Sequence, residues 1–159
     1  MPSSSSPDRY CVVALLASME VGDRVDRRVW PAHVTLASNF CTEASVADLV
    51  EILREVPADQ PVTFRVGGTA MFGQQQDIAV RLVESSRADH LHGVLVDRLH
   101  QLPGFAADEP AFWGEGFRAH LTLGPVVDAA EGEILRSTRI GIARIDGAEA
   151  ELVAALEIG

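Results

Sequence analysis

The clearest chemistry in this chain lies in two copies of a His-x-Thr motif. His33 and Thr35 form the first copy, and His120 and Thr122 form the second, 87 positions further along the chain. Apolar residues occupy the alternate positions of both copies, which is typical of a half-buried strand. Because side chains alternate across a strand, the histidine and threonine of each copy share one face. Two such strands facing one another would present two imidazoles and two hydroxyls to a single cleft.

This set of side chains suits the cleavage of a phosphodiester. One neutral imidazole can deprotonate an attacking water or hydroxyl, and one imidazolium can protonate the leaving oxygen. The threonine hydroxyls can donate to the non-bridging oxygens as charge builds on them. The two motif segments, residues 33–40 and 117–127, contain no Asp or Glu. Two imidazoles alone hold a metal poorly, so we predict neither a metal site nor a cofactor.

Several residues near the motifs could bind the substrate. Arg118 lies two residues before His120 and therefore on the same strand face, where it could contact a phosphate; an exposed surface arginine is the alternative. Aromatic rings could stack on a nucleobase, although packing in the core is an alternative role for each of them. The aromatic candidates are Trp30, Phe40, Phe72 and Trp113.

The remaining histidines and the two cysteines indicate no further site. His90, His92 and His100 lie on one predicted helix, and their spacing does not build a metal site. We expect them on a solvated helix face. Cys11 and Cys41 are too few for a disulfide framework or a zinc site, which favours a reducing cytoplasm.

Length and composition indicate one ordinary globular domain. The chain has 159 residues, of which 47% are hydrophobic and 23% charged. Its net charge of −10 argues against wrapping a long nucleic acid, but it does not exclude a small anionic ligand. We find no apolar run long enough to span a membrane and no basic segment ahead of an apolar one that would indicate a secretory signal. A monomer is the default expectation.

The elements that must position the motifs follow from periodicity. Residues 1–8 are rich in Ser and Pro and are expected to form a disordered tail, with one domain over 9–159. We expect strands at 9–18, 33–40, 62–66, 77–83 and 117–127, and two more within 138–158. We expect helices at 45–56, at 86–102 and from Asp128 to about residue 136. Thr42 and Ser45 are rival N-caps of the first helix, and Gly67-Gly68 predicts a break, bend or bulge after the strand at 62–66.

The two motifs in their context resemble a known family. The segments WPAHVTL and FRAHLTLGP, the strand and helix in DIAVRLVESSRADHLHGVLVDRL and the carboxyl-terminal strand pair carry the likeness. They resemble the two-histidine phosphoesterase superfamily, in particular its 2′-5′ RNA ligase-like and RNA 2′,3′-cyclic phosphodiesterase branch. The resemblance implies an α+β, bilobal, pseudo-duplicated fold. Two largely antiparallel sheets would face a central cleft, with the helices on the outside.

The resemblance also implies an activity. It implies metal-independent hydrolysis of 2′,3′-cyclic phosphates of nucleotides or RNA ends, or reversible 2′-5′ RNA ligation. Its catalytic residues would be His33, Thr35, His120 and Thr122, with His120 as base and His33 as acid or in the reverse order. Residues 19–30 are charged and irregular and are expected to hold one short helical turn where the family commonly has a full helix, and 37–40 lack the basic residue often found there. A small cyclic nucleotide is therefore as good a candidate as RNA.

Two other functions compete with the enzyme. A non-catalytic nucleotide- or phosphate-binding module would not need both histidines. An interaction domain of the same fold would have a cleft that side chains fill or block.

Overall fold

The computed structural model describes residues 7–72, 75–123 and 129–159, which form ten strands and two helices. The strands are β1 (Asp8–Leu15), β2 (Arg24–Asp26), β3 (His33–Thr42), β4 (Val62–Phe72), β5 (Ile78–Glu84), β6 (Ala106–Ala107), β7 (His120–Thr122), β8 (Ile134–Ser137), β9 (Arg139–Asp146) and β10 (Glu149–Glu157). The helices are α1 (Val46–Arg54) and α2 (Ser86–Leu99). Short 3-10 turns lie at η1 (Arg27–Val29), η2 (Pro110–Phe112) and η3 (Gly114–Gly116).

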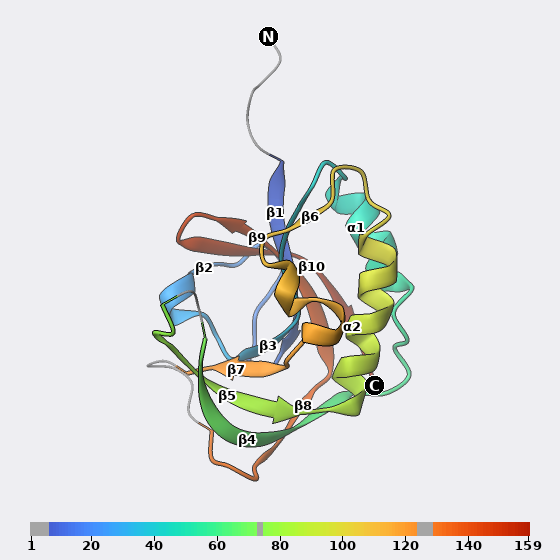
Figure 1. The fold of residues 1–159 in the computed structure, drawn as a ribbon. Helices are drawn as coiled ribbons and strands as arrows, with labels where there is room; N and C mark the ends of the chain where they lie inside the picture. The colour runs from blue at the N-terminus through green and yellow to red at the C-terminus, as the bar shows by residue number, and fades with distance from the viewer. Residues whose placement is uncertain (1–6, 73–74, 124–128) are drawn as a thin grey trace.

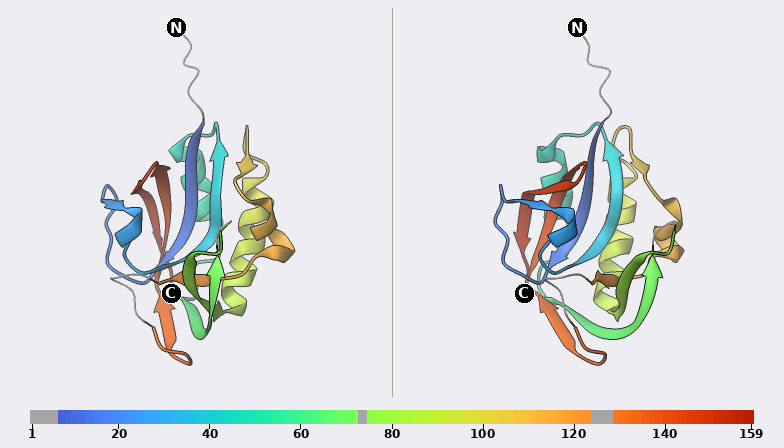
Figure 2. Two further views of the ribbon diagram at one scale, coloured as in Figure 1. Left: turned by 60° about the vertical axis from the view of Figure 1, so that its left-hand side comes forward. Right: turned by 90° about the vertical axis from the view of Figure 1, so that its left-hand side faces the viewer.

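The strands form an antiparallel sheet in two lobes, as the α+β prediction requires. Its order is β2-β10-β9-β1-β3-β7-β5-β4-β8, with β6 paired to β3. One residue pair, Val34 with Leu121, joins β3 of the first lobe to β7 of the second. Figure 1 shows α1 and α2 together on one side of the strands, and the right view of Figure 2 shows both lobes in front of them. The fold prediction is therefore confirmed, and the two motif strands are the ones that join the lobes.

Each face of the first lobe contributes to a separate apolar cluster. Tyr10 and Val12 of β1 point into the larger cluster, which also contains the buried faces of α1 and α2. Cys11 and Val13 of the same strand point into a smaller cluster on the opposite face. Because β1 is buried on both faces, its sequence is a continuous apolar run instead of an alternating one. At about 25 cal/mol per Å² of apolar surface, this burial is what holds the lobe together.

Capping and helix-stopping residues set the limits of the first helix. The Ser45 hydroxyl accepts from the Asp48 N–H, and the Asp48 carboxylate accepts from the Ser45 N–H. Such a capping box stabilises a helix by about 1 kcal/mol. Thr42, the rival candidate, is buried at the end of β3, where its hydroxyl donates to the Pro103 carbonyl. Ser45 is therefore the N-cap, and α1 ends shortly before Pro57.

The structure departs from three of the predicted elements. Within the described residues, the strand predicted at 117–127 is confined to β7, and residues 124–127 of it lie outside the described part. The helix predicted from Asp128 to 136 is wrong, because Ile134–Ser137 form β8, which pairs with the free edge of β4. Gly132, with φ at 87°, turns the chain just before that strand. β4 continues through Gly67-Gly68, where a register shift against β5 marks a bulge and not a break.

Candidate active site

The four motif residues lie on one face of the joined strands. Val34 of β3 and Leu121 of β7 are almost fully buried in the core beneath α2, so their neighbours in sequence point to the other face. Val34 is paired with Leu121 in an antiparallel register. One step further in each direction, this register places His33 opposite Thr122 and Thr35 opposite His120. The two motifs are thus related by a local twofold axis through the Val34–Leu121 pair, although α1 follows its motif strand in the chain and α2 precedes its own.

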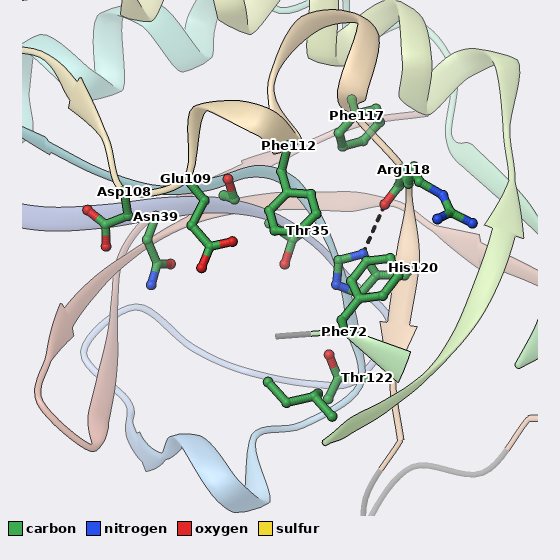
Figure 3. A pocket seen from close by; sticks show the side chains of 12 residues that line it. Thr35, Asn39, Phe72, Asp108, Glu109, Phe112, Phe117, Arg118, His120 and Thr122 are labelled. Carbon is green, nitrogen blue, oxygen red and sulfur yellow. Dashed lines mark hydrogen bonds between the residues drawn. The ribbon is translucent and has the colours of Figure 1, made fainter. Parts of the chain in front are cut away.

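Both imidazoles are held in the same way. Nδ1 of His33 lies 2.8 Å from the Pro31 carbonyl oxygen, and Nδ1 of His120 lies 2.9 Å from that of Arg118. A carbonyl oxygen can only accept, so each Nδ1 carries the proton, and the neutral ring has its lone pair on Nε2. Each ring also contacts an aromatic residue, Trp30 at 4.2 Å from His33 and Phe72 at 4.5 Å from His120, between ring centroids. Figure 3 shows the His120 ring and its bond to Arg118.

The protein lowers the pKa of both histidines. The pKa of His33 is lowered to about 4, chiefly by burial and to a smaller extent by a charge on His120, against the opposing effect of the Pro31 hydrogen bond. Burial also lowers the pKa of His120, and the Arg118 guanidinium acts in the same direction, while the hydrogen bond to the Arg118 carbonyl opposes both. Both rings are therefore mainly neutral at pH 7. A bound phosphate anion would favour the protonation of one of them.

An open cavity of about 270 Å³ lies on this face. From the motifs, Thr35, His120 and Thr122 line it. His33 does not line it, because it lies half-buried against Trp30, one register step away. The other lining residues are Ser38, Asn39, Phe72, Ile78, Asp108, Glu109, Phe112, Phe117 and Arg118.

The structure corrects two of the predicted substrate-binding residues. Phe40 is fully buried and packs against Tyr10, and Trp113 is 8% exposed and packs edge-on against Phe40. Neither ring can therefore stack on a ligand in the cleft. Phe40 lies an even number of residues from Val34, so the alternation that places the motif already places Phe40 in the core.

The phenylalanine rings that line the cleft are Phe72, Phe112 and Phe117. Phe72 and Phe112 are stacked almost parallel, with centroids 5.8 Å apart. The Arg118 guanidinium lies 5.7 Å from the centroid of Phe72, so Arg118 also borders the cavity. Phe112, Asn39, Asp108 and Glu109 were not among the sequence candidates. Three of these four lie in the irregular segment between α2 and β7, where no periodic pattern indicates which way a side chain points.

His92 is not on a solvated face, unlike His90 and His100, which are exposed as predicted. It is 3% exposed, and its ring stacks on Phe117 with centroids 3.9 Å apart. Its Nε2 accepts from the Gly114 N–H at 2.9 Å, and its Nδ1 donates to the Leu36 carbonyl at 2.7 Å. His92 therefore ties the segment that carries Phe112 and Phe117 to the strand that carries Thr35.

We expect His92→Leu to lower the free energy of unfolding by roughly 2–4 kcal/mol, because it leaves the buried Leu36 carbonyl and the partly buried Gly114 N–H without this partner and removes the ring stacked on Phe117. Burial lowers the pKa of His92, against the opposing effects of the Leu36 hydrogen bond and the Asp89 charge. Its contribution is thus complete above about pH 6.5 and is lost as the pH falls below that value. Urea unfolding at pH 7.5 and at pH 5.5 measures both effects, with exposed His90→Leu as the control. Equal losses in the two variants would contradict this role.

In residues 7–72, 75–123 and 129–159, no three His, Cys, Asp or Glu side chains gather as metal ligands. Cys11 and Cys41 are both free thiols. No helix in the described part of the chain is long and apolar enough to cross a membrane.

Comparison with known proteins agrees with this site. The 2′-5′ RNA ligase superfamily model matches residues 13–139, which include both motifs. The fold is similar to Escherichia coli LigT complexed with NADP⁺, with a TM-score of 0.57, 13% identity, and coverage of 97% of this chain and 99% of that one. TT0787 of Thermus thermophilus has a TM-score of 0.56, 14% identity and coverage of 94% and 97%. A phosphoesterase structure has a TM-score of 0.58, 12% identity and coverage of 96% and 98%.

None of the curated proteins matches the chain in sequence. At these identities the structural likeness establishes the fold alone. The family follows from the sequence match, which spans most of the chain, so this protein belongs to the 2′-5′ RNA ligase superfamily, as its paired His-x-Thr motifs predict.

Proposed function

We propose that this protein is a metal-independent cyclic phosphodiesterase acting on the 2′,3′-cyclic phosphates of nucleotides or RNA ends. The observation that carries the proposal is the matched fixation of His33 and His120, each by an Nδ1–H bond to a carbonyl two residues earlier. Because each Nδ1–H is bonded to a carbonyl, the Nε2 atom of each ring is the one available for proton transfer. Both rings lie on the strand face that also holds Thr35 and Thr122. Membership of a family of ligases and phosphoesterases supports an enzyme of this class.

The reaction needs one neutral and one protonated imidazole. The neutral Nε2 takes a proton from water, whose oxygen bonds to phosphorus. The bond from phosphorus to one ribose oxygen breaks, and that oxygen receives the proton of the other imidazolium. The threonine hydroxyls donate to the non-bridging oxygens, and the product is a ribose phosphomonoester. If an RNA 5′-hydroxyl replaces the water, the same steps join two RNA ends.

The local twofold relates the two motif strands, but the surroundings of the two imidazoles differ, because His120 lines the cavity and His33 packs against Trp30. We keep both orders of proton transfer in the proposal, His120 as base with His33 as acid and the reverse. The orientation of the bound cyclic phosphate would select between them.

The open cleft supports an enzyme over an interaction domain, whose cleft would be filled. A binding module remains the second candidate and differs in needing no imidazolium. The two free cysteines fit the cytoplasm, which we propose as the compartment. We propose a monomer whose ligand is a cyclic nucleotide or an RNA terminus.

We expect the protein to hydrolyse nucleoside 2′,3′-cyclic monophosphates at a rate that excess chelator changes by less than about twofold. The reason is that the imidazolium and the hydroxyls supply the charge stabilisation that a metal would otherwise give. The assay is product formation before and after chelation, with the His33→Ala/His120→Ala double variant as the blank. Loss of activity on chelation, with recovery on added Mg²⁺ or Zn²⁺, would overturn the metal-free mechanism. Binding without turnover would favour the binding module.

A further inference from the structure

The end of the cleft away from His120 is polar and acidic. Asn39, Asp108 and Glu109 line the same cavity as Thr35 and His120. Figure 3 shows their side chains on the opposite side of the cavity from Arg118. A substrate of the proposed kind is an anion, and carboxylates repel phosphate. These groups must therefore face a part of the substrate that carries no phosphate.

The two carboxylates are not equivalent. Asp108 is paired with the Arg9 Nε at 2.8 Å, and its backbone N–H donates to the Asn39 carbonyl. The Glu109 side chain has no hydrogen bond or ion pair with any described residue, and it is half-buried. Arg9 thus balances the charge of Asp108, whereas the charge of Glu109 faces the cavity uncompensated.

Between the two ends, the cleft is apolar and small. Phe72 and Phe112, which lie parallel, contribute flat surface next to the His120 ring. The cavity of about 270 Å³ is at the lower limit of small-molecule sites, which range over roughly 300–1,000 Å³. This volume is close to that of a single nucleotide unit, so a longer chain would extend beyond the cavity.

We infer that Glu109 determines substrate specificity and favours cyclic phosphates whose remaining part carries no second phosphate. This inference rests on the proposed function. The favoured substrate class is a nucleoside 2′,3′-cyclic phosphate whose base carries an exocyclic amine. An amine N–H can donate to the Glu109 carboxylate or to the side-chain amide oxygen of Asn39. A 5′-phosphate or a preceding nucleotide would bring a second negative charge towards Glu109. Such substrates are disfavoured by like-charge repulsion.

The test compares two substrates in two proteins. Cytidine 2′,3′-cyclic phosphate and the dinucleotide ending in the same group are assayed with the wild type and with Glu109→Gln, which keeps the shape and removes the charge. We expect the ratio of kcat/KM for the dinucleotide over the mononucleotide to rise roughly tenfold in the variant. The matched control is Glu115→Gln, an exposed carboxylate on η3 that does not line the cavity and should leave the ratio unchanged.

Salt distinguishes repulsion from a structural effect. Raising the ionic strength should increase the wild-type ratio and leave the Glu109→Gln ratio nearly constant, because only the charge is screened. An unchanged ratio in Glu109→Gln at low salt would overturn the inference and leave the proposed function intact.

If neither substrate is hydrolysed, the proposed function is overturned, but the role of Glu109 in substrate discrimination can still be tested by binding measurements. Calorimetry with cytidine 3′-monophosphate and cytidine 3′,5′-bisphosphate reports the same discrimination. A wild type that binds the bisphosphate as tightly as the monophosphate would refute the role of Glu109.

Discussion

Replacing His33 or His120 by alanine is expected to lower the hydrolysis of 2′,3′-cyclic nucleotides at least about 100-fold, the usual contribution of a positioned acid or base. Each variant removes one of two proton-transfer groups that the local twofold places on either side of the phosphorus. Because the two act together, the double variant should be little worse than either single one. Thr35→Ala and Thr122→Ala should cost less, on the order of tenfold for each lost donor.

The measurement is kcat/KM on one cyclic mononucleotide for the wild type and the five variants, with unfolding curves to show that each variant folds. His90→Ala is the matched control, because His90 is an exposed histidine of α2 that does not line the cleft. Its activity should equal that of the wild type. Activity surviving in the double variant would place the chemistry outside this cleft.

The motif face could be predicted because it depends on local rules. Strand alternation puts His33 and Thr35 opposite Val34, and the same rule holds around Leu121. The caps and stops of the two helices are also local. Which strands pair is decided by tertiary contacts, so the sequence around Ile134 was compatible with a helix until β4 supplied a partner.

The burial of two of the corrected residues follows from their positions. His92 lies four residues after Ala88 and three before Leu95, on the apolar face of α2, and helical periodicity alone indicates that it is buried. Phe40 lies an even number of residues from Val34 in β3, which likewise indicates burial. For both side chains, position in the element is stronger evidence than residue type.

The acidic end of the cleft had no such signal. β6 pairs Ala107 with Phe40 of β3, and that pairing carries Asp108 and Glu109 to the cavity. The link is between residues far apart in the chain, in a segment without periodicity. Sequence patterns therefore predict the paired motifs of this family and do not predict the residues at the acidic end of the cleft.

The pH dependence of kcat/KM should be a bell whose maximum lies below pH 6.5. The free enzyme is active when one imidazole is charged and the other neutral, and kcat/KM reports the free enzyme. Burial lowers the pKa of His33 to about 4 and also lowers that of His120. A lowered pKa means that the proton is lost at a lower pH. Above pH 6.5 the active fraction should therefore fall about tenfold per pH unit, or roughly 100-fold between pH 6.5 and 8.5. Because the two rings interact, the limbs belong to the pair and not to either residue.

Trp30 offers a direct test of the physical cause. Its ring lies 4.2 Å from that of His33, between centroids, and covers it from water. Trp30→Ala should therefore raise the pKa of His33 and move a limb of the bell to higher pH. The pKa itself can be followed by NMR titration of the imidazole protons. In the same titration, His120→Ala should raise the pKa of His33 slightly, because the variant removes the neighbouring positive charge. The change should be small, because the charge on His120 lowers this pKa less than burial does. A profile that stays flat from pH 6 to 9, or a His33 that titrates at its ordinary pKa in the wild type, would contradict the buried acid–base pair on which the mechanism depends.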